Sequence, residues 1–226
     1  MVISSLSDRP WRRLSWLVLA PHADDETLGA GALIAHASAA GQLAGLVYLT
    51  DGSGSHDLPA GGAGRLIAAR RREAATALFR LTGSRRNPPL HLGWKDAAPA
   101  AAESPAFART VGRVAALCRR LQVDAIAVTA LDEPHCDHAA AAQIAYAVQG
   151  RATRRLTVAE YYVWGAVPAA RRYRAVRTRP MPVGRRRHAL RAHRSQLTQS
   201  HGPGFRLPKD KQRMPASDIL FIERKS

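Results

Sequence analysis

Two short segments of the 226-residue sequence concentrate side chains that can bind a metal ion or transfer a proton. The first, Pro21-His22-Ala23-Asp24-Asp25-Glu26, places four ionisable residues directly after an apolar run. The second, His135-Cys136-Asp137-His138, repeats the mixture of imidazole and carboxylate. Crowded carboxylates repel one another unless a cation or hydrogen bonds offset their charge. Together the two segments indicate a metal site able to activate water.

The two segments carry more weight together than apart. His22 and Asp25 are one turn-like step apart, so both can point at one ion. Two imidazoles and one carboxylate suit a zinc ion that keeps one position open for water, as catalytic zinc sites do. Taken alone, each segment is also typical of a helix cap or a surface turn. Their occurrence after separate predicted strands favours the metal site.

The elements that must position these segments alternate between short apolar runs and longer amphipathic stretches. This alternation predicts an α/β fold, a Rossmann-like three-layer sandwich with a mostly parallel sheet. Loops at the carboxyl ends of parallel strands meet at one edge of such a sheet, so we expect the two segments to meet there. The predicted strands are 14–20, 43–49, 90–92, 125–129, 156–163 and 218–223, and the predicted helices are 27–40, 65–81, 106–121, 139–148 and 185–196.

Composition indicates one domain spanning residues 1–226, with an arginine-rich C-terminal part (about 168–226) whose structure is less defined by pattern. The apolar run at 16–20 is too short for a membrane span or a signal peptide, and two cysteines make no disulfide framework. We therefore expect a cytoplasmic protein. The net charge of +17 raises the hypothesis of an anionic partner, although a solvated arginine-rich surface explains the same charge.

The order of several motifs resembles the PIG-L/LmbE-like deacetylases, a family of zinc-dependent enzymes that includes N-acetylglucosaminyl-phosphatidylinositol deacetylases. The first and second segments look like the two signature motifs of that family. Further matches occur in the same order between residues 14 and 200: Leu49-Thr50-Asp51-Gly52, Arg70-Arg71-Arg72-Glu73-Ala74, Leu92-Gly93-Trp94-Lys95-Asp96 and His193-Arg194-Ser195-Gln196. Ala23 and Cys136 replace prolines that are usual in the family, at positions that supply no ligand there.

The resemblance implies a role for each candidate residue. His22, Asp25 and His138 would hold the ion, which is zinc or, on the same donors, ferrous iron. Asp24 would be the general base that takes a proton from water. His135 would act from the opposite side as an imidazolium that stabilises the oxyanion and protonates the leaving amine, and Asp137 would orient it.

Arg70 and Asp96 would contact the substrate, and Glu26 would cap the following helix or support the ligand loop. For Arg70, a place on a solvated helix face beside Arg71 and Arg72 is an equally good expectation. The implied substrate is a small N-acetylated sugar or sugar conjugate. An acidic acceptor, facing the arginine-rich C-terminal part, is a further hypothesis.

Two other functions remain open from the sequence. A metal-dependent phosphoesterase would use similar ligands, but a second ion needs more carboxylates than the pattern places near the first. A basic nucleic-acid-binding module would use the arginine-rich region, but the sequence has no reading motif or interleaved aromatic residues, so no nucleic acid is expected as partner. Oligomeric state is not readable from the sequence.

Overall fold

A computed structural model describes residues 3–59, 61–165 and 172–224. Its eight strands form one sheet in the order β1-β7-β8-β6-β5-β2-β3-β4. The strand pairs are parallel except those of β8, which runs antiparallel to β6 and β7. The predicted α/β class with a mostly parallel sheet is therefore confirmed. The strands are β1 (Ile3–Ser5), β2 (Trp16–Ala20), β3 (Leu43–Thr50), β4 (Leu90–Trp94), β5 (Ala125–Thr129), β6 (Thr157–Tyr161), β7 (Tyr173–Arg177) and β8 (Ile219–Glu223).

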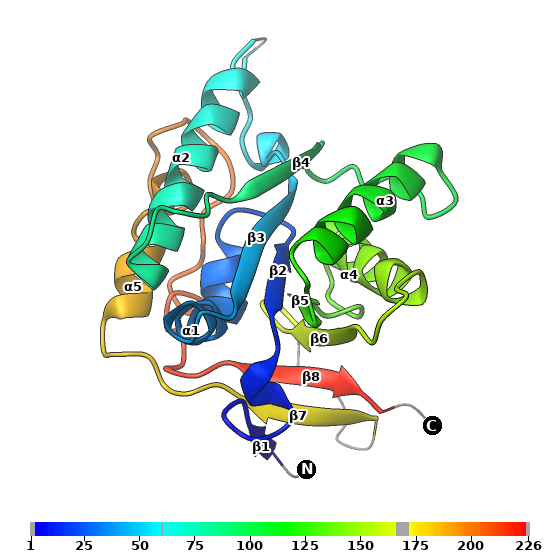
Figure 1. The fold of residues 1–226 in the computed structure, drawn as a ribbon. Helices are drawn as coiled ribbons and strands as arrows, with labels where there is room; N and C mark the ends of the chain where they lie inside the picture. Colours follow the sequence, from blue (N-terminus) through cyan, green and yellow to red (C-terminus); the bar gives the residue numbers. More distant parts are fainter. Residues whose placement is uncertain (1–2, 60, 166–171, 225–226) are drawn as a thin grey trace.

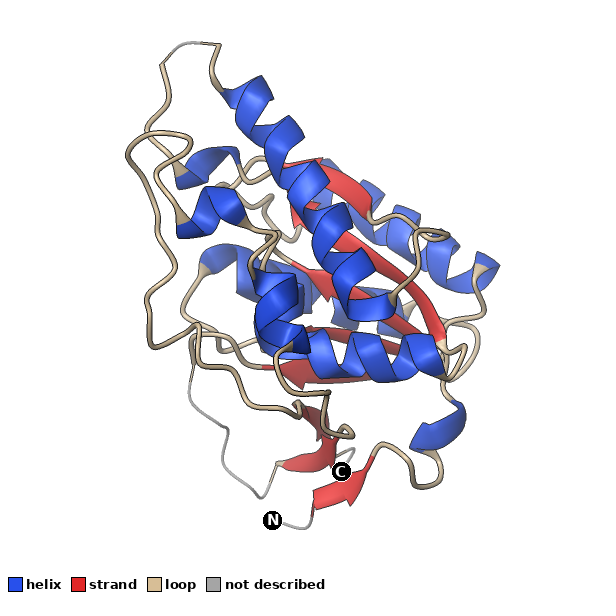
Figure 2. Cartoon of the chain, turned by 90° about the vertical axis from the view of Figure 1, so that its left-hand side faces the viewer, coloured by secondary structure: helices blue, strands red, loops and turns tan. Residues whose placement is uncertain are grey.

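Helices cover both faces of this sheet (Figure 1). The α-helices are α1 (Asp25–Ala39), α2 (Ala63–Thr82), α3 (Pro105–Arg120), α4 (Cys136–Gly150), α5 (Arg185–Leu190) and α6 (Arg194–Leu197), with short 3-10 helices η1 (Trp11–Arg13) and η2 (Ser53–Ser55). Figure 1 shows α1, α2 and α5 on one side of the strands and α3 and α4 on the other. Figure 2 gives the first of these layers face on.

Strand β2 shows why the sequence folds this way. All five of its residues are buried, and its side chains alternate between two hydrophobic clusters. Val18 and Ala20 pack with α1 and α2, whereas Leu17 and Leu19 pack with α3 and α4. A strand that is apolar on both faces suits the centre of a parallel sheet covered by helices.

The order of the strands creates a switch point beside β2. The chain runs from β2 through α1 to β3 on one side, and later returns through α3 to β5 on the other side of β2. Ligands of open α/β sheets bind where the strand order reverses, outside the carboxyl ends of the strands. The loops that follow β2 and β5 here are those that carry residues 21–26 and 130–138.

Several predicted elements differ from the observed ones. Strands β1 and β7 were not predicted, because arginine occupies exposed positions of β7 and obscures its apolar residues. The helix predicted over 185–196 is two helices, α5 and α6, separated at residues 191–193. The helix predicted from residue 139 begins at Cys136, which brings His138 into its first turn.

Close packing between α1 and β6 makes Gly29 a sensitive position. An added Cβ at Gly29 would overlap the ring of Tyr161, whose side chain is fully buried and has no room to move. We expect Gly29→Ala to lower the free energy of unfolding by about 1–3 kcal/mol in urea denaturation.

Gly112, on the exposed side of α3, is the matched control for that substitution. No neighbouring atom lies within 4 Å of a Cβ added there. Gly112→Ala should raise the free energy of unfolding by about 0.5–1 kcal/mol, since alanine favours helix. Equal stability of the two variants would refute the packing account.

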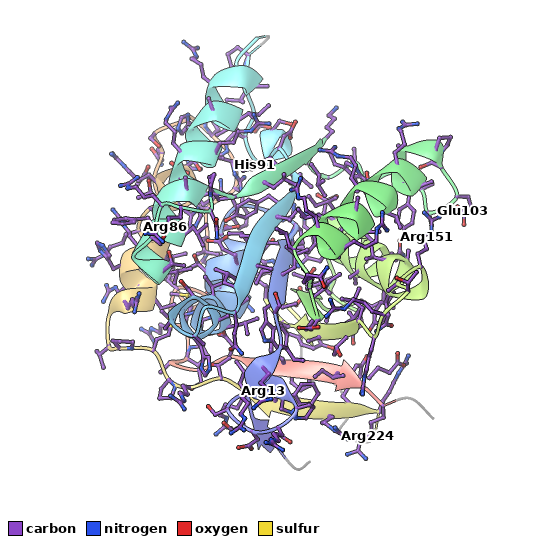
Figure 3. All side chains as sticks on the ribbon, viewed as in Figure 1. Arg13, Arg86, His91, Glu103, Arg151 and Arg224 are labelled. Carbon is purple, nitrogen blue, oxygen red and sulfur yellow. The ribbon has the colours of Figure 1, made fainter. Side chains whose placement is uncertain are left out.

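Positive charge is distributed around the molecule. Arg13 in η1 and Arg86, Arg151 and Arg224 after α2, α4 and β8 are exposed and lie at separate edges (Figure 3). Arginines at separate edges are typical of a solvated arginine-rich surface. Within the described residues, no helix has the length and apolarity needed to cross a membrane.

Candidate metal centre and surrounding site

The structure brings the two sequence segments together at the switch point. His22 follows β2, Asp25 opens α1, and His138 lies in the first turn of α4. Asp25 Oδ2 lies 3.1 Å from His22 Nδ1 and 3.2 Å from His138 Nε2. Ligand atoms about 2.1 Å from a tetrahedral zinc ion are about 3.4 Å apart, so this spacing fits one ion.

In each of the two histidines, the ring nitrogen that faces away from Asp25 lies close to a second carboxylate. His22 Nε2 lies 3.0 Å from Asp137 Oδ2, and His138 Nδ1 lies 3.2 Å from Glu133 Oε2. Metal-binding histidines are oriented in this way, because the outer N–H donates to a carboxylate and leaves the other nitrogen free for the ion. His22 Nδ1 and His138 Nε2 are thus the atoms presented to Asp25.

Two features of the site indicate that a cation fits there. They are a buried histidine nitrogen without a well-formed hydrogen bond and the carboxylates that lie close to it. His138 is fully buried, and its Nε2, although 3.2 Å from Asp25 Oδ2, makes no hydrogen bond of standard geometry within the described residues. Burial lowers the pKa of His138, but the Asp25 and Glu133 carboxylates together raise that pKa to about 9. Positive charge is therefore strongly favoured at this point, and a bound metal ion would take the place of the proton.

Donor atoms of two overlapping groups lie within 4.8 Å of one another in the described part of the chain. One group is His22, His135 and His138, and the other is His22, Asp96, His135 and Asp137. Because the groups share His22 and His135, they describe one locality rather than two separate ion sites. More carboxylates gather here than the sequence alone indicated, since Asp96 Oδ1 lies 3.1 Å from His22 Nε2.

Asp24 is buried beside the candidate ligands. Burial and the neighbouring Asp25 carboxylate raise the pKa of Asp24 to about 7, against the opposing effect of Arg70. A carboxyl group whose pKa is near neutrality is suited to accept and return a proton. Its backbone has φ 142°, a conformation that side-chain-bearing residues rarely adopt.

His135 and Asp137 differ from the expected pair. The Asp137 carboxylate is 4.0 Å from His135 Nδ1, which is too far for a hydrogen bond, and it contacts His22 Nε2 and the Ala97 backbone N–H instead. His135 Nδ1 accepts the backbone N–H of Asp137 at 3.2 Å. Burial, with His22 and His138 nearby, lowers the pKa of His135. The hydrogen bond between His135 and the Asp137 carboxylate expected from the sequence is not formed, and the lowered pKa of His135 disfavours the imidazolium expected there.

Arg70 is buried, unlike its exposed neighbours Arg71 and Arg72, so the solvated helix face does not apply to it. Its guanidinium donates to the Ala23 carbonyl at 3.0 Å and lies 4.0 Å from Asp24 Oδ1. Arg70 also packs on Gly52, where a Cβ would lie 2.6 Å from the arginine Cδ. Its place is thus partly structural, since it joins the loops after β2 and β3.

These residues border a cavity of about 610 Å³. The cavity is lined by His22, Asp24, Asp25, Gly54, Ser55, His56, Asp57, Arg70, Asp96, Ala97, Pro134, His135, Trp164, Gln196, Gly204 and Phe205. Among the described residues, Arg70 is the only arginine in this lining, although the C-terminal part contributes Gln196, Gly204 and Phe205, and Arg206 Nη1 lies 3.2 Å from Nε2 of the lining residue His56. Phe205 packs beside Trp164, with ring centroids 6.1 Å apart.

Glu133 is the residue that the sequence reasoning missed. Its carboxylate is buried, contacts His138 Nδ1, and accepts the backbone N–H groups of residues 163–165. The acidic residue beside Pro134 was the available signal, but only the fold shows which histidine it orients. Cys136 is exposed and belongs to neither donor group.

Known proteins share this fold. N,N'-diacetylchitobiose deacetylase from Pyrococcus horikoshii superposes with a TM-score of 0.68 at 17% identity, over 95% of this chain and 86% of that one. A teicoplanin-biosynthesis deacetylase gives 0.61 at 18%, over 93% and 98%. The 4-carboxy-2-hydroxymuconate hydratase from Pseudomonas putida KT2440 gives 0.59 at 17%, over 94% and 98%. At these identities the likeness concerns the fold, which supports more than one reaction.

A search among curated proteins gave no match to the sequence. The family model described as PIG-L, GlcNAc-PI de-N-acetylase, matches residues 17–149. This range includes both signature segments and the switch point between them, and it confirms the resemblance inferred from the motifs. The chain belongs to the PIG-L family.

Proposed function

We propose that the protein is a metal-dependent hydrolase that removes the acyl group from an N-acylated amino sugar or sugar conjugate. The observation that carries the proposal is the convergence of His22 Nδ1, Asp25 Oδ2 and His138 Nε2 beside the buried carboxyl group of Asp24. Family membership supports deacetylation as the reaction. Zinc is the proposed ion, because two imidazoles and a carboxylate suit it.

We propose Asp25, and not His135, as the third metal ligand beside His22 and His138. His135 Nδ1 is already engaged by the Asp137 N–H, whereas Asp25 Oδ2 lies between the two other histidines. Asp25 also brings negative charge, which reduces the cost of holding a divalent cation in a buried site. When bound, the ion polarises the acyl carbonyl and lowers the pKa of water.

Three side chains around this position have separate roles in the proposed reaction. Asp24 takes the proton from the attacking water, and the same carboxyl group then returns it to the departing nitrogen. His135, whose Nδ1 accepts the Asp137 N–H, donates its Nε2–H to the negative charge that develops on the acyl oxygen. Arg70 holds the Ala23 carbonyl and lies beside Asp24, which fixes the loop from which the base acts.

The cavity suits a small and largely uncharged acceptor. Trp164 and Phe205 supply an apolar wall, and Asp96 supplies hydrogen-bond acceptors for hydroxyl groups. An N-acetylated sugar presents apolar ring faces and hydroxyl groups of this kind. We therefore propose that a neutral N-acetyl amino sugar is hydrolysed at least as well as its anionic derivatives.

Removal of the metal tests this function directly. Treatment with a chelator, followed by dialysis, should abolish release of free amine from N-acetyl amino sugars, and one equivalent of zinc per chain should restore it. Restoration only at two ions per chain, together with release of phosphate from phosphate esters, would instead establish a two-metal phosphoesterase. Full activity of the metal-free protein would refute the proposal.

A further inference from the structure

Asp24 has a backbone conformation that needs support from its surroundings. Its φ of 142° and ψ of −31° are unfavourable for any residue with a side chain, and such strain persists only where neighbouring contacts hold it. The Asp24 carbonyl accepts the N–H groups of Thr27 and Leu28, both at 2.9 Å, as α1 begins. Its own N–H donates to Glu26 Oε2 at 2.9 Å. Glu26 therefore closes the turn that presents Asp24.

The support for Glu26 comes from the distant end of the chain. Glu26 and His193 are both completely buried, and His193 Nε2 donates to Glu26 Oε1 at 2.9 Å. His193 Nδ1 has no hydrogen-bond partner within the described residues. The contact with Glu26 is thus the one side-chain hydrogen bond that His193 makes there. His193 lies in the break between α5 and α6, outside the range matched by the family model.

The segment of residues 193–195 is also hydrogen-bonded to α2. The Ser195 backbone N–H and Oγ donate to the two carboxylate oxygens of Glu73, at 2.9 and 2.6 Å. Glu73 lies one turn from Arg70, which binds the Ala23 carbonyl. Residues 193–195 thereby reach the loop after β2 along two paths, through Glu26 and through α2.

We propose that His193 is a positioning residue that fixes Asp24 through Glu26. This inference rests on the proposed function for its kinetic consequences, but the geometry it describes is independent of the substrate. His193 does not line the cavity, whereas Asp24 does. Loss of the His193 hydrogen bond leaves the Thr27 hydroxyl as the remaining partner of the buried Glu26 Oε1 and removes the link to residues 193–195, which frees the turn to relax. The base would then be misplaced with the metal ligands intact.

The test compares two substitutions of similar volume. His193→Leu removes the donor, and His193→Gln keeps an N–H able to reach Glu26 Oε1. We expect kcat of the leucine variant to fall at least tenfold, with KM within twofold and bound zinc per chain unchanged. The glutamine variant should recover most of kcat. His188→Gln, at an exposed histidine of the same region, is the control and should match the wild type.

Hydrogen exchange supplies a readout besides activity. In the leucine variant, backbone amides of residues 21–28 should exchange at least tenfold faster than in the wild type, and the glutamine variant should restore their protection. His193→Ala replaces the leucine variant if that protein does not fold. Unchanged kcat and unchanged exchange in the donor-free variant would overturn the inference. If the wild-type protein hydrolyses no N-acyl amine, the proposed function is refuted. Hydrogen exchange of residues 21–28 would still decide the role of His193.

Discussion

Replacement of Asp24 by asparagine is expected to leave one metal ion per chain and to lower kcat by about 10²–10⁴-fold. Asparagine has nearly the same shape but accepts no proton at neutral pH. The metal should stay, because the donor atoms of His22, Asp25 and His138 face one another without the Asp24 carboxylate. The measurements are metal content by mass spectrometry and the rate of amine release at saturating substrate.

Asp57→Asn is the matched control for that variant. Asp57 lines the same cavity but is exposed at its rim, and it contacts none of the candidate ligands. The control should keep kcat within a few fold of the wild type. An Asp24→Asn enzyme as active as the wild type would show that another group accepts the proton, and the assigned base would be wrong.

The second large effect is expected for His138→Ala, which should lose both metal and activity. His138 is completely buried, presents Nε2 to Asp25 and is held by Glu133 on its other nitrogen. Removal of one of three protein ligands leaves too few donors to retain the ion through dialysis. Bound zinc should fall from one per chain to a small fraction, and amine release should fall with it.

His36→Ala controls for the loss of a histidine in general. His36 lies near the end of α1, far along the helix from Asp25, and belongs to neither donor group. This variant should bind metal as the wild type does. Retention of one tightly bound zinc by His138→Ala would exclude His138 as a ligand and would favour the group that contains Asp96 and Asp137.

Much of the site was predictable because chemistry and topology pointed to the same place. The apolar runs of β2 and β5 are buried on both faces, so they had to be central strands, and the residues after them had to share an edge. The composition of the two segments then indicated a cation. The side-chain convergence of His22, Asp25 and His138 is the arrangement that this reasoning requires.

The rest depends on contacts that no local pattern records. The partner of Asp137 is His22 across the switch point rather than its sequence neighbour His135, because the fold places residues 22 and 137 at adjacent strand ends. Glu133 was overlooked for the same reason. The break between α5 and α6 interrupts a helical pattern so that His193 can reach Glu26, a tertiary contact that overrides local propensity.

The fold itself leaves the reaction open, since a hydratase and two deacetylases share it with this chain. The central claim is that this site breaks an amide bond. The most direct test incubates the zinc-loaded protein with N-acetylglucosamine and related N-acetyl sugars and measures both products. We predict equimolar release of acetate and free amine, dependent on the metal. Consumption of an unsaturated acid by hydration, with no acetate and no amine released from any N-acetyl sugar, would contradict it.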